Sequence, residues 1–587
     1  MGEGRSELKQ RSTPRRSERD AAPARSGRRV KGALQAKDAL KIIPLGGLDG
    51  IGKNMTCFEY HDEMMLVDAG LMFPDDDHPG VDLILPDYSY VLENARKLKG
   101  IVITHGHEDH TGALPYLIKD LGDKVPIYAS DLTLGFIKGK FEEFHIRNIP
   151  MRKVTSGHMI NLGCFKVHFF RVTHSIPGAF GVFIESPAGN VMMTGDFKLD
   201  QTPIDGQRTD FAAISRFADR GIDLLMSDST NSRHADFTQS EATVGPVLRD
   251  ITMHAKRKVI VASFASHIHR MQQICDAAVA AGRKVAVTGR SMLTNSKIAR
   301  DLGYLNIKDK DIIDAYDIKK IPPHKLLVLC TGSQGEPLSA LARMAAGEHR
   351  TVDIESGDTV IISANPVPGN EKAVTRVINE LAKIGADVYD KSRAHVHVSG
   401  HGGSEELKIM LSLCHPRNFM PVHGESQHLR AHAQLAEAIG IPSNHIYVEE
   451  NGEVLLLKDG QIKESKPVES GIIYVDGLSV GDLDEVVLKD RQTLSSDGFV
   501  TVVCMLKAGT GKSAGEPEVI MKGVAGGDDP ALVSQMVKIA DDALKRSAGE
   551  KHANENRIKR GVRDGLSKFL WQKVKRRPMI IPILMEV

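Results

Sequence analysis

Short apolar runs that end at polar residues dominate the chain from residue 40 to about residue 195. Their length and their content of β-branched and aromatic residues are typical of strands buried in a sheet. The runs are 40–45, 55–60, 64–67, 100–103, 127–129, 165–172, 180–185 and 191–193. Only a few stretches here, such as 114–121, predict helices. We therefore expect a strand-rich unit with polar residues of interest at its strand ends.

The pattern changes from about Ala235, where apolar runs alternate with longer amphipathic segments. The expected strands are 258–262, 284–287, 326–329 and 359–362, and the clearest helices between them are 269–281 and 370–384. Alternation of this kind predicts a parallel sheet covered by helices. Histidines return at 394–401 and 420–424, and a last α/β unit ends the chain.

The order of these regions predicts an α/β domain inserted into a strand-rich domain. The division that we expect is a disordered basic tail at 1–37, the strand-rich domain at 38–235 and 386–466, the insertion at 236–385, a linker at 467–498 and a C-terminal domain at 499–587. A chain of 587 residues is long enough for three or four domains of about 150 residues each.

Composition indicates the environment in which the protein works rather than its activity. Hydrophobic residues make up 41% and charged residues 26%, as in ordinary soluble proteins, and a net charge of +1 indicates no acidic or basic partner. The six cysteines form no C-x-x-C pair, so we expect reduced thiols in a cytoplasmic protein. No apolar run approaches the roughly 18 residues that span a bilayer.

The first 37 residues are rich in Arg, Ser, Pro and Ala and poor in large apolar side chains, so we expect them to be disordered. They lack the apolar segment of a secretory signal. The acidic residues Glu3, Glu7, Glu18 and Asp20 argue against an organellar transit peptide. Two interpretations stay open: a solvated tail, or an arm that binds polyanions without sequence preference.

The stretch Thr104-His105-Gly106-His107-Glu108-Asp109-His110 concentrates four metal-capable side chains within six residues. Because it follows the run 100–103, we expect these ligands on a loop at a strand end and not on a helix. Imidazoles two residues apart can converge on one ion, and a carboxylate with a third imidazole can hold a second ion beside it. The alternative is a solvated loop that happens to contain histidines, and this order of residues disfavours it.

The loop, a later strand-end His174 and the pair Gly195-Asp196 together resemble the metallo-β-lactamase superfamily. The resemblance implies a four-layer αββα sandwich with a dinuclear site that usually holds zinc. The ligands that it implies are His105, His107 and His174 for one zinc ion, Asp109, His110 and His423 for the other, and Asp196 bridging both. Asp68, at the end of its strand, would orient the ligands from behind, as metal-bound histidines require.

Three further motifs resemble the β-CASP nucleases and, over residues 40–587, the bacterial ribonuclease J family. They are Asp228-Ser229-Thr230-Asn231, His397-Val398-Ser399-Gly400-His401 and Pro421-Val422-His423-Gly424-Glu425, with supporting stretches at 71–74, 331–337 and 475–477. A histidine in the last motif is the pattern of members that process RNA. The fold class implied is α/β: a metallo-β-lactamase αββα sandwich with an inserted α/β β-CASP domain and a small C-terminal α/β domain.

The same resemblance implies a zinc-dependent ribonuclease. It would act mainly as a 5′→3′ exonuclease that prefers 5′-monophosphate ends, with some endonuclease activity, in mRNA decay and rRNA maturation. Two zinc ions would activate water for attack on phosphorus and offset charge on the phosphate, and Mn²⁺ or Mg²⁺ could also support activity. The catalytic residues implied are Asp109, Asp196, Asp228 and His401, of which His401 would contact the scissile phosphate.

The positions that contact RNA in the family, including its pocket for the terminal phosphate, correspond to Ser266, His267, His397, Ser399 and His401. The family commonly has Asn where this chain has His267. An imidazole can also donate to phosphate, but we expect its charge to depend on pH near 6.5.

Some members bind a structural calcium ion. Gly80, through its carbonyl, Asp82 and Asp476 fall on the matching positions, and hard oxygen ligands suit Ca²⁺. Solvated surface carboxylates are an equally open interpretation.

The C-terminal unit carries basic segments at 557–563 and 573–577 on either side of Trp571, the only tryptophan. A basic helix with an aromatic residue could bind the RNA backbone; alternatively, the helix face is solvated and Trp571 lies in the core. The partners implied by the resemblance are single-stranded RNA, further copies of the chain in a homodimer or homotetramer, and RNA-degradation factors such as a helicase. We expect no membrane association.

Two other functions compete with the nuclease. A small-molecule hydrolase, such as a glyoxalase-II-like thioesterase or a lactamase, shares the first metal motif but does not explain the inserted domain, His397 or His401. A non-enzymatic RNA-binding scaffold with an inactive site is disfavoured because all seven implied ligands are present.

Overall fold

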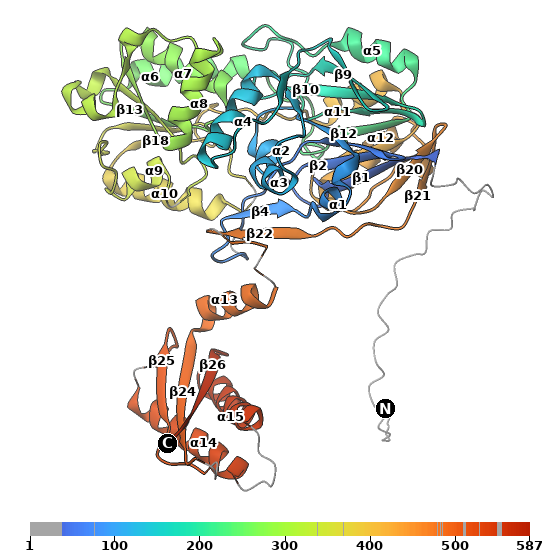
Figure 1. Cartoon of the computed structure of the whole chain (residues 1–587). Helices are drawn as coiled ribbons and strands as arrows, with labels where there is room; N and C mark the ends of the chain where they lie inside the picture. Colours follow the sequence, from blue (N-terminus) through green and yellow to red (C-terminus); the bar gives the residue numbers. More distant parts are fainter. Residues whose placement is uncertain are drawn as a thin grey trace, which may run out of the picture.

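The computed structural model describes residues 38–587 except 76, 337, 368, 478, 482, 484, 509–511, 528 and 549–554. The tail expected at 1–37 lies outside the described residues. Figure 1 shows a large body and, apart from it, a smaller C-terminal unit that helix α13 (Glu485–Asp497) joins to the body.

Two sheets form the centre of the large body. The first runs in the order β21 (Gln461–Glu464), β20 (Leu455–Lys458), β1 (Leu40–Gly46), β2 (Met55–Tyr60), β3 (Glu63–Val67), β5 (Leu98–Val102), β6 (Ile127–Ala129), β7 (Met151–Lys153). The second runs in the order β19 (Phe419–Val422), β12 (Leu224–Asp228), β11 (Gly189–Met193), β10 (Phe180–Ser186), β9 (Phe165–Arg171), β8 (Met159–Leu162). A shared core that includes Phe58 and Val182 joins the two sheets.

Helices cover the outer face of each sheet. Those on the first are α1 (Ser89–Glu93), α3 (Leu114–Leu121) and α4 (Asp131–Glu143), and those on the second are α5 (Phe211–Arg220), α11 (Ser404–Cys414) and α12 (Ser426–Ala438). In β1, Ile42 faces the other sheet and Ile43 faces the helices, and both are fully buried. Burial on both faces explains the continuous apolar run. The four layers confirm the predicted αββα sandwich.

The inserted region forms a third sheet in which every neighbouring pair is parallel. Its order is β15 (Ile312–Ile313), β14 (Lys284–Thr288), β16 (Leu326–Cys330), β13 (Val259–Ala262), β17 (Thr359–Ile362), β18 (Asp387–Tyr389). The accompanying helices are α6 (Val244–His254), α7 (Ile268–Ala280), α8 (Arg290–Asp301), α9 (Ala340–Ala345) and α10 (Glu371–Ile384). Since β18 pairs with β17, this sheet extends beyond the boundary expected at 385. The half-buried β18 has too weak an apolar pattern to be recognised in the sequence.

The segment expected as a linker at 467–498 is largely built into ordered structure. It contains β22 (Ile472–Asp476), β23 (Ser479–Val480) and α13, and β22 pairs with β4 (Leu83–Pro86) of the large body. Tyr474 of β22 and Leu488 of α13 are buried in one small apolar cluster with Val81 and Ile84. This cluster attaches the segment to the body, which the prediction of a linker did not anticipate.

The C-terminal unit is a three-stranded sheet with helices on one face. The strand order is β25 (Glu518–Lys522), β24 (Phe499–Leu506), β26 (Met579–Glu586), and the helices are α14 (Pro530–Ala548) and α15 (Glu555–Val574). The opposite face exposes Met505, Ile520, Ile581, Ile583 and Met585. Trp571 is 44% exposed, with the Arg577 guanidinium 4.7 Å from its ring, so the interpretation that it lies in the core is wrong.

The predicted elements are confirmed in type and place, with 114–121 forming α3 and 127–129 forming β6. Among the described residues, no helix has the length and apolarity needed to cross a bilayer.

Candidate metal centre

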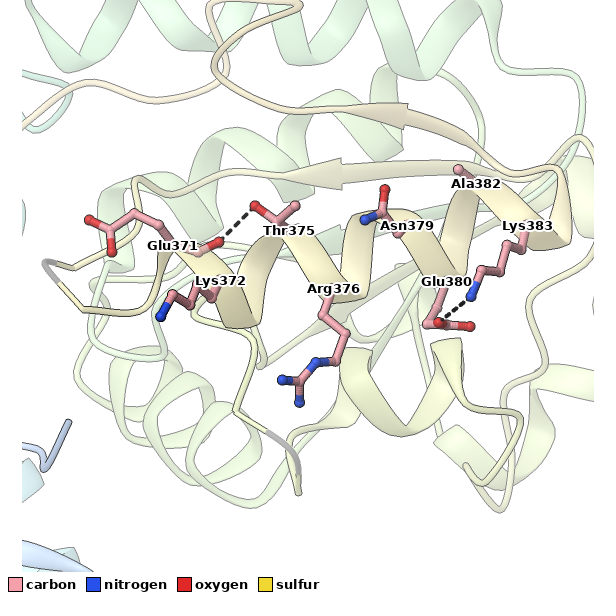
Figure 2. Close-up of a pocket in the computed structure, with 8 residues that line it drawn as sticks. All are labelled: Glu371, Lys372, Thr375, Arg376, Asn379, Glu380, Ala382 and Lys383. Carbon is pink, nitrogen blue, oxygen red and sulfur yellow. Dashed lines mark hydrogen bonds and ion pairs between the residues drawn. The ribbon is translucent and has the colours of Figure 1, made fainter. Parts of the chain in front are cut away.

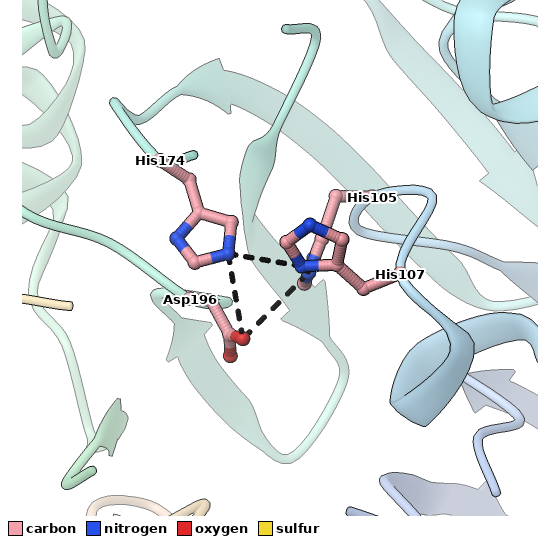
Figure 3. Close-up of side chains that lie close together, drawn as sticks. All are labelled: His105, His107, His174 and Asp196. Carbon is pink, nitrogen blue, oxygen red and sulfur yellow. Dashed lines mark hydrogen bonds and ion pairs between the residues drawn. The ribbon is translucent and has the colours of Figure 1, made fainter. Parts of the chain in front are cut away.

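The loop after β5 brings His105 and His107 against His174, which follows β9 (Figure 3). His105 Nε2 lies 3.0 Å from His107 Nδ1, and His174 Nε2 lies 3.1 Å from the same nitrogen. The Asp196 carboxylate, after β11, is 3.6 Å from His105 Nε2 and 3.8 Å from His174 Nε2. Side chains from three segments thus direct their ligand atoms toward one point.

Asp109 and His110 depart from the expectation that the ligands avoid helices. They lie in the one-turn helix α2 (Glu108–Thr111), which begins directly after His107. The His107 carbonyl accepts hydrogen bonds from the N–H groups of His110 (3.1 Å) and Thr111 (2.9 Å), and these bonds close the turn. The prediction of a loop is therefore right for His105 and His107 and wrong for the two residues that follow.

A second group of ligand atoms forms around His423, which follows β19. His423 Nε2 is 3.2 Å from Asp109 Oδ2, and His423 Nδ1 is 3.1 Å from Asp196 Oδ1. His110 Nε2 is 3.2 Å from the other Asp196 oxygen, Oδ2. Asp196 is therefore shared by both groups, as a bridging ligand must be.

Asp68 holds the second group from behind. Its Oδ1 accepts from the N–H of Thr104 at 2.8 Å, and its Oδ2 is 2.8 Å from His110 Nδ1, which leaves His110 Nε2 for the centre. Asp68 (φ 61°) and His423 (φ 55°) both have left-handed backbones, which cost about 1–3 kcal/mol in a non-glycine residue. Such strain clusters at functional sites, where the surrounding structure sustains it.

The imidazoles fall into two sets, one with pKa values below 6.5 and one with pKa values above it. It lowers the pKa of His105 and His174 well below 6.5 and that of His107 to about 4. Burial also opposes charge on His110 and His423, but the surrounding carboxylates, Asp196 foremost, together outweigh it and raise the pKa of both well above 6.5. The first set is in the neutral form that binds metal, whereas protons provide the positive charge in the second.

His401 and Asp228 form a third group of ligand-type atoms together with Asp196 and His423. His401 Nδ1 is 2.7 Å from Asp228 Oδ2, at the end of β12. Burial would lower the pKa of His401, but the Asp228 carboxylate raises it, and His401 in turn keeps the pKa of Asp228 low against burial. The His401 side chain is 20% exposed and that of Asp228 only 1%, so the imidazole can reach a bound molecule.

The segment that returns from the inserted region touches the ligands directly. His174 Nδ1 donates to the carbonyl of Gly400 at 2.8 Å. A Cβ at Gly400 would lie 2.7 Å from His174 Cε1, so a side chain there would displace the imidazole. The short distance explains why glycine stands between Ser399 and His401.

The donor set suits metal ions such as zinc. Three imidazoles and a carboxylate meet in the first group, and two imidazoles and two carboxylates in the second. Each neutral imidazole has a single N–H, so the neighbouring nitrogens of His105, His107 and His174 cannot all satisfy one another by hydrogen bonds. A space of about 30 Å³ lined by His110, Asp196 and His423 could hold a group the size of an ion or a water.

His267 and His397, two of the expected RNA contacts, are both oriented by Arg270 of α7. The backbone N–H of Arg270 donates to His267 Nδ1 at 3.3 Å, and its Nη1 is 3.4 Å from His397 Nδ1. With both Nδ1 atoms acting as acceptors, each neutral ring has its proton on Nε2. In the described part of the chain, the buried Nε2 of His267 has no hydrogen-bond partner.

The expectation that His267 changes its charge near pH 6.5 is wrong. Burial and the positive charge of Arg270 lower the pKa of His267 well below 6.5, and the same causes lower that of His397. Both rings are therefore neutral donors at physiological pH.

Ser266 and Ser399, the two remaining candidates, have different surroundings. Ser266 is in the turn before α7, where its carbonyl accepts from the N–H of Ile268 at 2.9 Å. Ser399 Oγ accepts from Asn231 Nδ2 at 2.9 Å and from the N–H of His401 at 3.1 Å. Ser399 therefore belongs to the framework of His401.

Three contributing residues were not recognised in the sequence: Arg270, Glu241 and Asn54. Arg270 is fully buried, and its Nε and Nη2 donate to the two carboxylate oxygens of Glu241 at 2.6 and 2.8 Å. Asn54 Nδ2 lies 3.1 Å from His110 Nε2 and donates to the Asp109 carbonyl at 3.0 Å. No motif signals these residues, because a buried arginine and a solvated one look alike in a sequence.

The expected calcium positions have a different partner. Arg491 Nη1 donates to the Gly80 carbonyl at 3.0 Å, and Arg491 Nη2 donates to Asp476 Oδ2 at 2.5 Å. Asp82 Oδ2 accepts from the N–H of Gly477 at 2.7 Å.

Two further hollows are present besides the space among the ligands. A cleft of about 340 Å³ reaches His174 between the sandwich and the inserted region, which contributes His269 and Tyr304. A shallow hollow of about 820 Å³ follows the surface of α10 (Figure 2). There the side chains pair within their own helix, as Lys383 does with Glu380 at 2.7 Å, which is typical of a solvated face.

Comparison with known families covers most of the chain. Residues 256–381 match "Ribonuclease J, beta-CASP domain", 486–587 match "Ribonuclease J C-terminal domain", 386–448 match "Zn-dependent metallo-hydrolase RNA specificity domain" and 66–272 match "Beta-lactamase superfamily domain".

Individual relatives match along nearly their whole length. Ribonuclease J of Mycolicibacterium smegmatis is 42% identical over 94% of this chain and 98% of its own, and that of Thermus thermophilus is 42% identical over 94% and 96%. Ribonuclease J2 of Bacillus subtilis is 39% identical over 93% and 99%. A solved protein of unknown function from Enterococcus faecalis shares the fold, with a TM-score of 0.51 and 17% identity over 71% of this chain and 100% of its own.

The sandwich, the inserted sheet and the ligand cluster define a metal-dependent nuclease of the β-CASP class within the metallo-β-lactamase superfamily. The relatives narrow this class further. The chain belongs to the ribonuclease J family.

Proposed function

We propose that the chain is a 5′→3′ exoribonuclease that prefers 5′-monophosphate ends, can also cut internally, and serves in mRNA decay and rRNA maturation. The observation that carries this proposal is the buried Nε2 of His267 near His397, which has no hydrogen-bond partner among the described residues and lies 3.6 Å from Glu241 Oε2. A terminal phosphate would accept from it, and the N-terminus of α7, which His267 caps, favours an anion. A phosphate fixed near the metal centre would direct cleavage to the first nucleotide.

We propose two zinc ions per chain, with Mn²⁺ or Mg²⁺ also able to support activity. The ligands would be His105, His107 and His174 for one ion, Asp109, His110 and His423 for the other, and Asp196 for both. When bound, the ions supply a nucleophile from water near neutral pH and offset charge on the phosphate. Asp68 would keep His110 Nε2 directed at its ion.

We assign His401 to the leaving group. Asp228 accepts from its Nδ1, so its Nε2 is left to donate to a phosphate oxygen or to protonate the departing 3′ oxygen. Asp228 favours the protonated imidazole, and Ser399 accepts from the N–H of His401 and steadies its backbone. Ser266 would add a hydroxyl to the phosphate pocket. Cleavage of the P–O3′ bond leaves a 5′-phosphate on the shortened RNA, which the same pocket can then take.

We also propose a division into domains, a set of partners and a location. The metallo-β-lactamase domain would comprise 38–235 and about 390–466, with the β-CASP domain between them and the C-terminal domain at 499–587, as the sheets are divided. The apolar outer face of β24, β25 and β26 supports assembly into a homodimer or homotetramer. Single-stranded RNA is the substrate, RNA-degradation factors such as a helicase are further partners, and the cytoplasm is the location.

The test is release of nucleotides from RNA labelled at its 5′ end. Wild type should release mononucleotides from 5′-monophosphorylated RNA, and more slowly from 5′-hydroxyl RNA, while His105→Ala should release none. His324→Ala, which removes an exposed histidine outside the centre, is the matched control and should behave as wild type.

Two outcomes would contradict the proposal. No cleavage by wild type with Zn²⁺, Mn²⁺ or Mg²⁺ would exclude the nuclease under these conditions. Internal fragments without any labelled mononucleotide would exclude the 5′→3′ exonuclease.

A further inference from the structure

The guanidinium of Arg491 lies among the oxygens that were expected to hold calcium. Two of its nitrogens donate in two directions, Nη1 to the carbonyl of Gly80 at 3.0 Å and Nη2 to Asp476 Oδ2 at 2.5 Å. Nη1 also reaches the carbonyl of Pro79 at 3.4 Å. Oxygens from two distant segments of the large body are thus joined by one side chain of α13.

These residues do not fit a calcium ion while Arg491 is in place. Calcium requires six to eight oxygens at about 2.3–2.6 Å. An ion within that distance of both Gly80 O and Asp476 Oδ2 would lie against the guanidinium, and the two positive charges would repel. The loop also fits closely around the arginine, since a Cβ at Gly80 would lie 2.8 Å from Arg491 Nη1.

We propose that Arg491 takes the place of a structural cation and that it fastens α13 to the catalytic body without metal. The planar guanidinium provides several N–H groups in fixed directions, so one side chain can satisfy a carbonyl and a carboxylate that an ion would otherwise join. Gln492 adds a second attachment, because its Nε2 donates to the carbonyl of Asp77 at 2.6 Å. We call Arg491, Gly80 and Asp476 the arginine latch.

The arginine latch lies at the connection between the two parts of the molecule. Leu488, one turn before Arg491, is buried with Val81 and Tyr474 of the body. The other end of α13 leads directly into β24, and Arg576 of the C-terminal unit is 3.3 Å from Asp497. The position of the C-terminal unit therefore depends on a contact that needs no ion.

The experiment measures calcium binding and thermal unfolding of the zinc-loaded full-length chain in buffer freed of calcium by a chelating resin. Wild type should bind no calcium at this place, and its Tm should be the same with and without added CaCl₂. Arg491→Met keeps the length of the side chain but removes its charge. It should lose about 2–4 °C in Tm without calcium and recover with CaCl₂, because the free carboxylates then accept the ion.

Three further variants separate charge from packing. Arg491→Lys should lose as much in Tm as Arg491→Met, because it loses the geometry that donates in two directions. It should not gain calcium binding, because it keeps the positive charge. Adding Asp476→Asn to Arg491→Met should abolish the recovery with calcium. Arg576→Met, which removes another ion pair to α13, is the matched control and should gain no response to calcium.

The proposal is overturned if wild type takes up calcium that Asp476→Asn removes. It is equally overturned if Arg491→Met unfolds as wild type does, or loses stability that calcium does not restore. None of these results depends on ribonuclease activity.

Discussion

At the metal centre, the buried carboxylates form ion pairs only with imidazoles among the described residues, whereas at the arginine latch a carboxylate and a carbonyl share a guanidinium. Asp196 lies 3.2 Å from His110 and 3.1 Å from His423, and among the described residues no Lys or Arg forms an ion pair with it. The difference teaches that similar donors give a metal site only where the fold provides no permanent cation. The metal centre and the arginine latch therefore differ in how the negative charge of their carboxylates is balanced, rather than in the kinds of donor atoms that they contain.

The largest expected effect comes from removing charge at the centre. Asp196→Asn should lower ribonuclease activity about 10³-fold or more, because both ligand groups lose their shared carboxylate. The content of bound metal, measured by elemental analysis, should fall in parallel. Activity within tenfold of wild type, at full metal content, would contradict the bridging role of Asp196 and with it the comparison of the two places.

Substitution of Arg270, a buried arginine that is paired with Glu241, should have an intermediate effect on activity. Arg270→Lys loses the fork that meets Glu241 and the contact to His397, so KM for 5′-monophosphorylated RNA should rise roughly tenfold. The preference over 5′-hydroxyl RNA should fall, while kcat changes less. If kcat falls and KM is unchanged, Arg270 does not act through His397.

Glu59, which is outside the ligand groups, is a second carboxylate paired with permanent cations, Lys41 and Lys97. Burial alone would raise the pKa of Glu59, but hydrogen bonds from Lys41 and Tyr90, both at 2.6 Å, lower it. Because the folded pKa is below the unfolded one, this stabilisation is complete above about pH 4.3 and is lost as the pH falls further. Glu59→Gln should cost about 1–2 kcal/mol in urea unfolding at pH 7, and the difference should shrink toward pH 3. A pH-independent difference would contradict the assignment.

The smallest effect is expected for His267→Asn, which restores the residue common in the family. Since the wild-type imidazole is neutral above its lowered pKa, the preference for 5′-monophosphate ends should follow the same pH profile in both proteins between pH 6 and pH 8. Values of kcat/KM should differ by less than about twofold at each pH, as expected when one neutral donor replaces another. A preference that declines with rising pH only in wild type would show that His267 titrates.

Local sequence patterns predicted most of the fold and the set of candidate ligands. The runs at 40–45 and 127–129 predicted their strands because burial on both faces requires continuous apolar sequence. His105 and His107 were recognised by the order of metal-capable residues in their loop, and His174 by the family resemblance in which it follows that loop.

Contacts between segments that are distant in the chain could not be predicted from the sequence. Arg270 and Arg491 differ from solvated arginines only in what surrounds them, and their partners Glu241 and Asp476 are ordinary carboxylates until the chain has folded. The same limit applies to the pKa of His267, which depends on burial and on a neighbouring charge. The short helix at Asp109 was missed because one turn carries no periodic pattern.

The bond from His174 to the Gly400 carbonyl has a consequence for the newly made protein. A ligand from the first half of the chain is oriented by a residue that is synthesised 226 positions later, and His423 joins Asp109 only across a separation of 314 residues. At about 5–20 residues per second, a ribosome needs on the order of 15–60 s to cover that interval. A growing chain therefore lacks a complete set of ligand side chains until His423 has been synthesised, late in its translation.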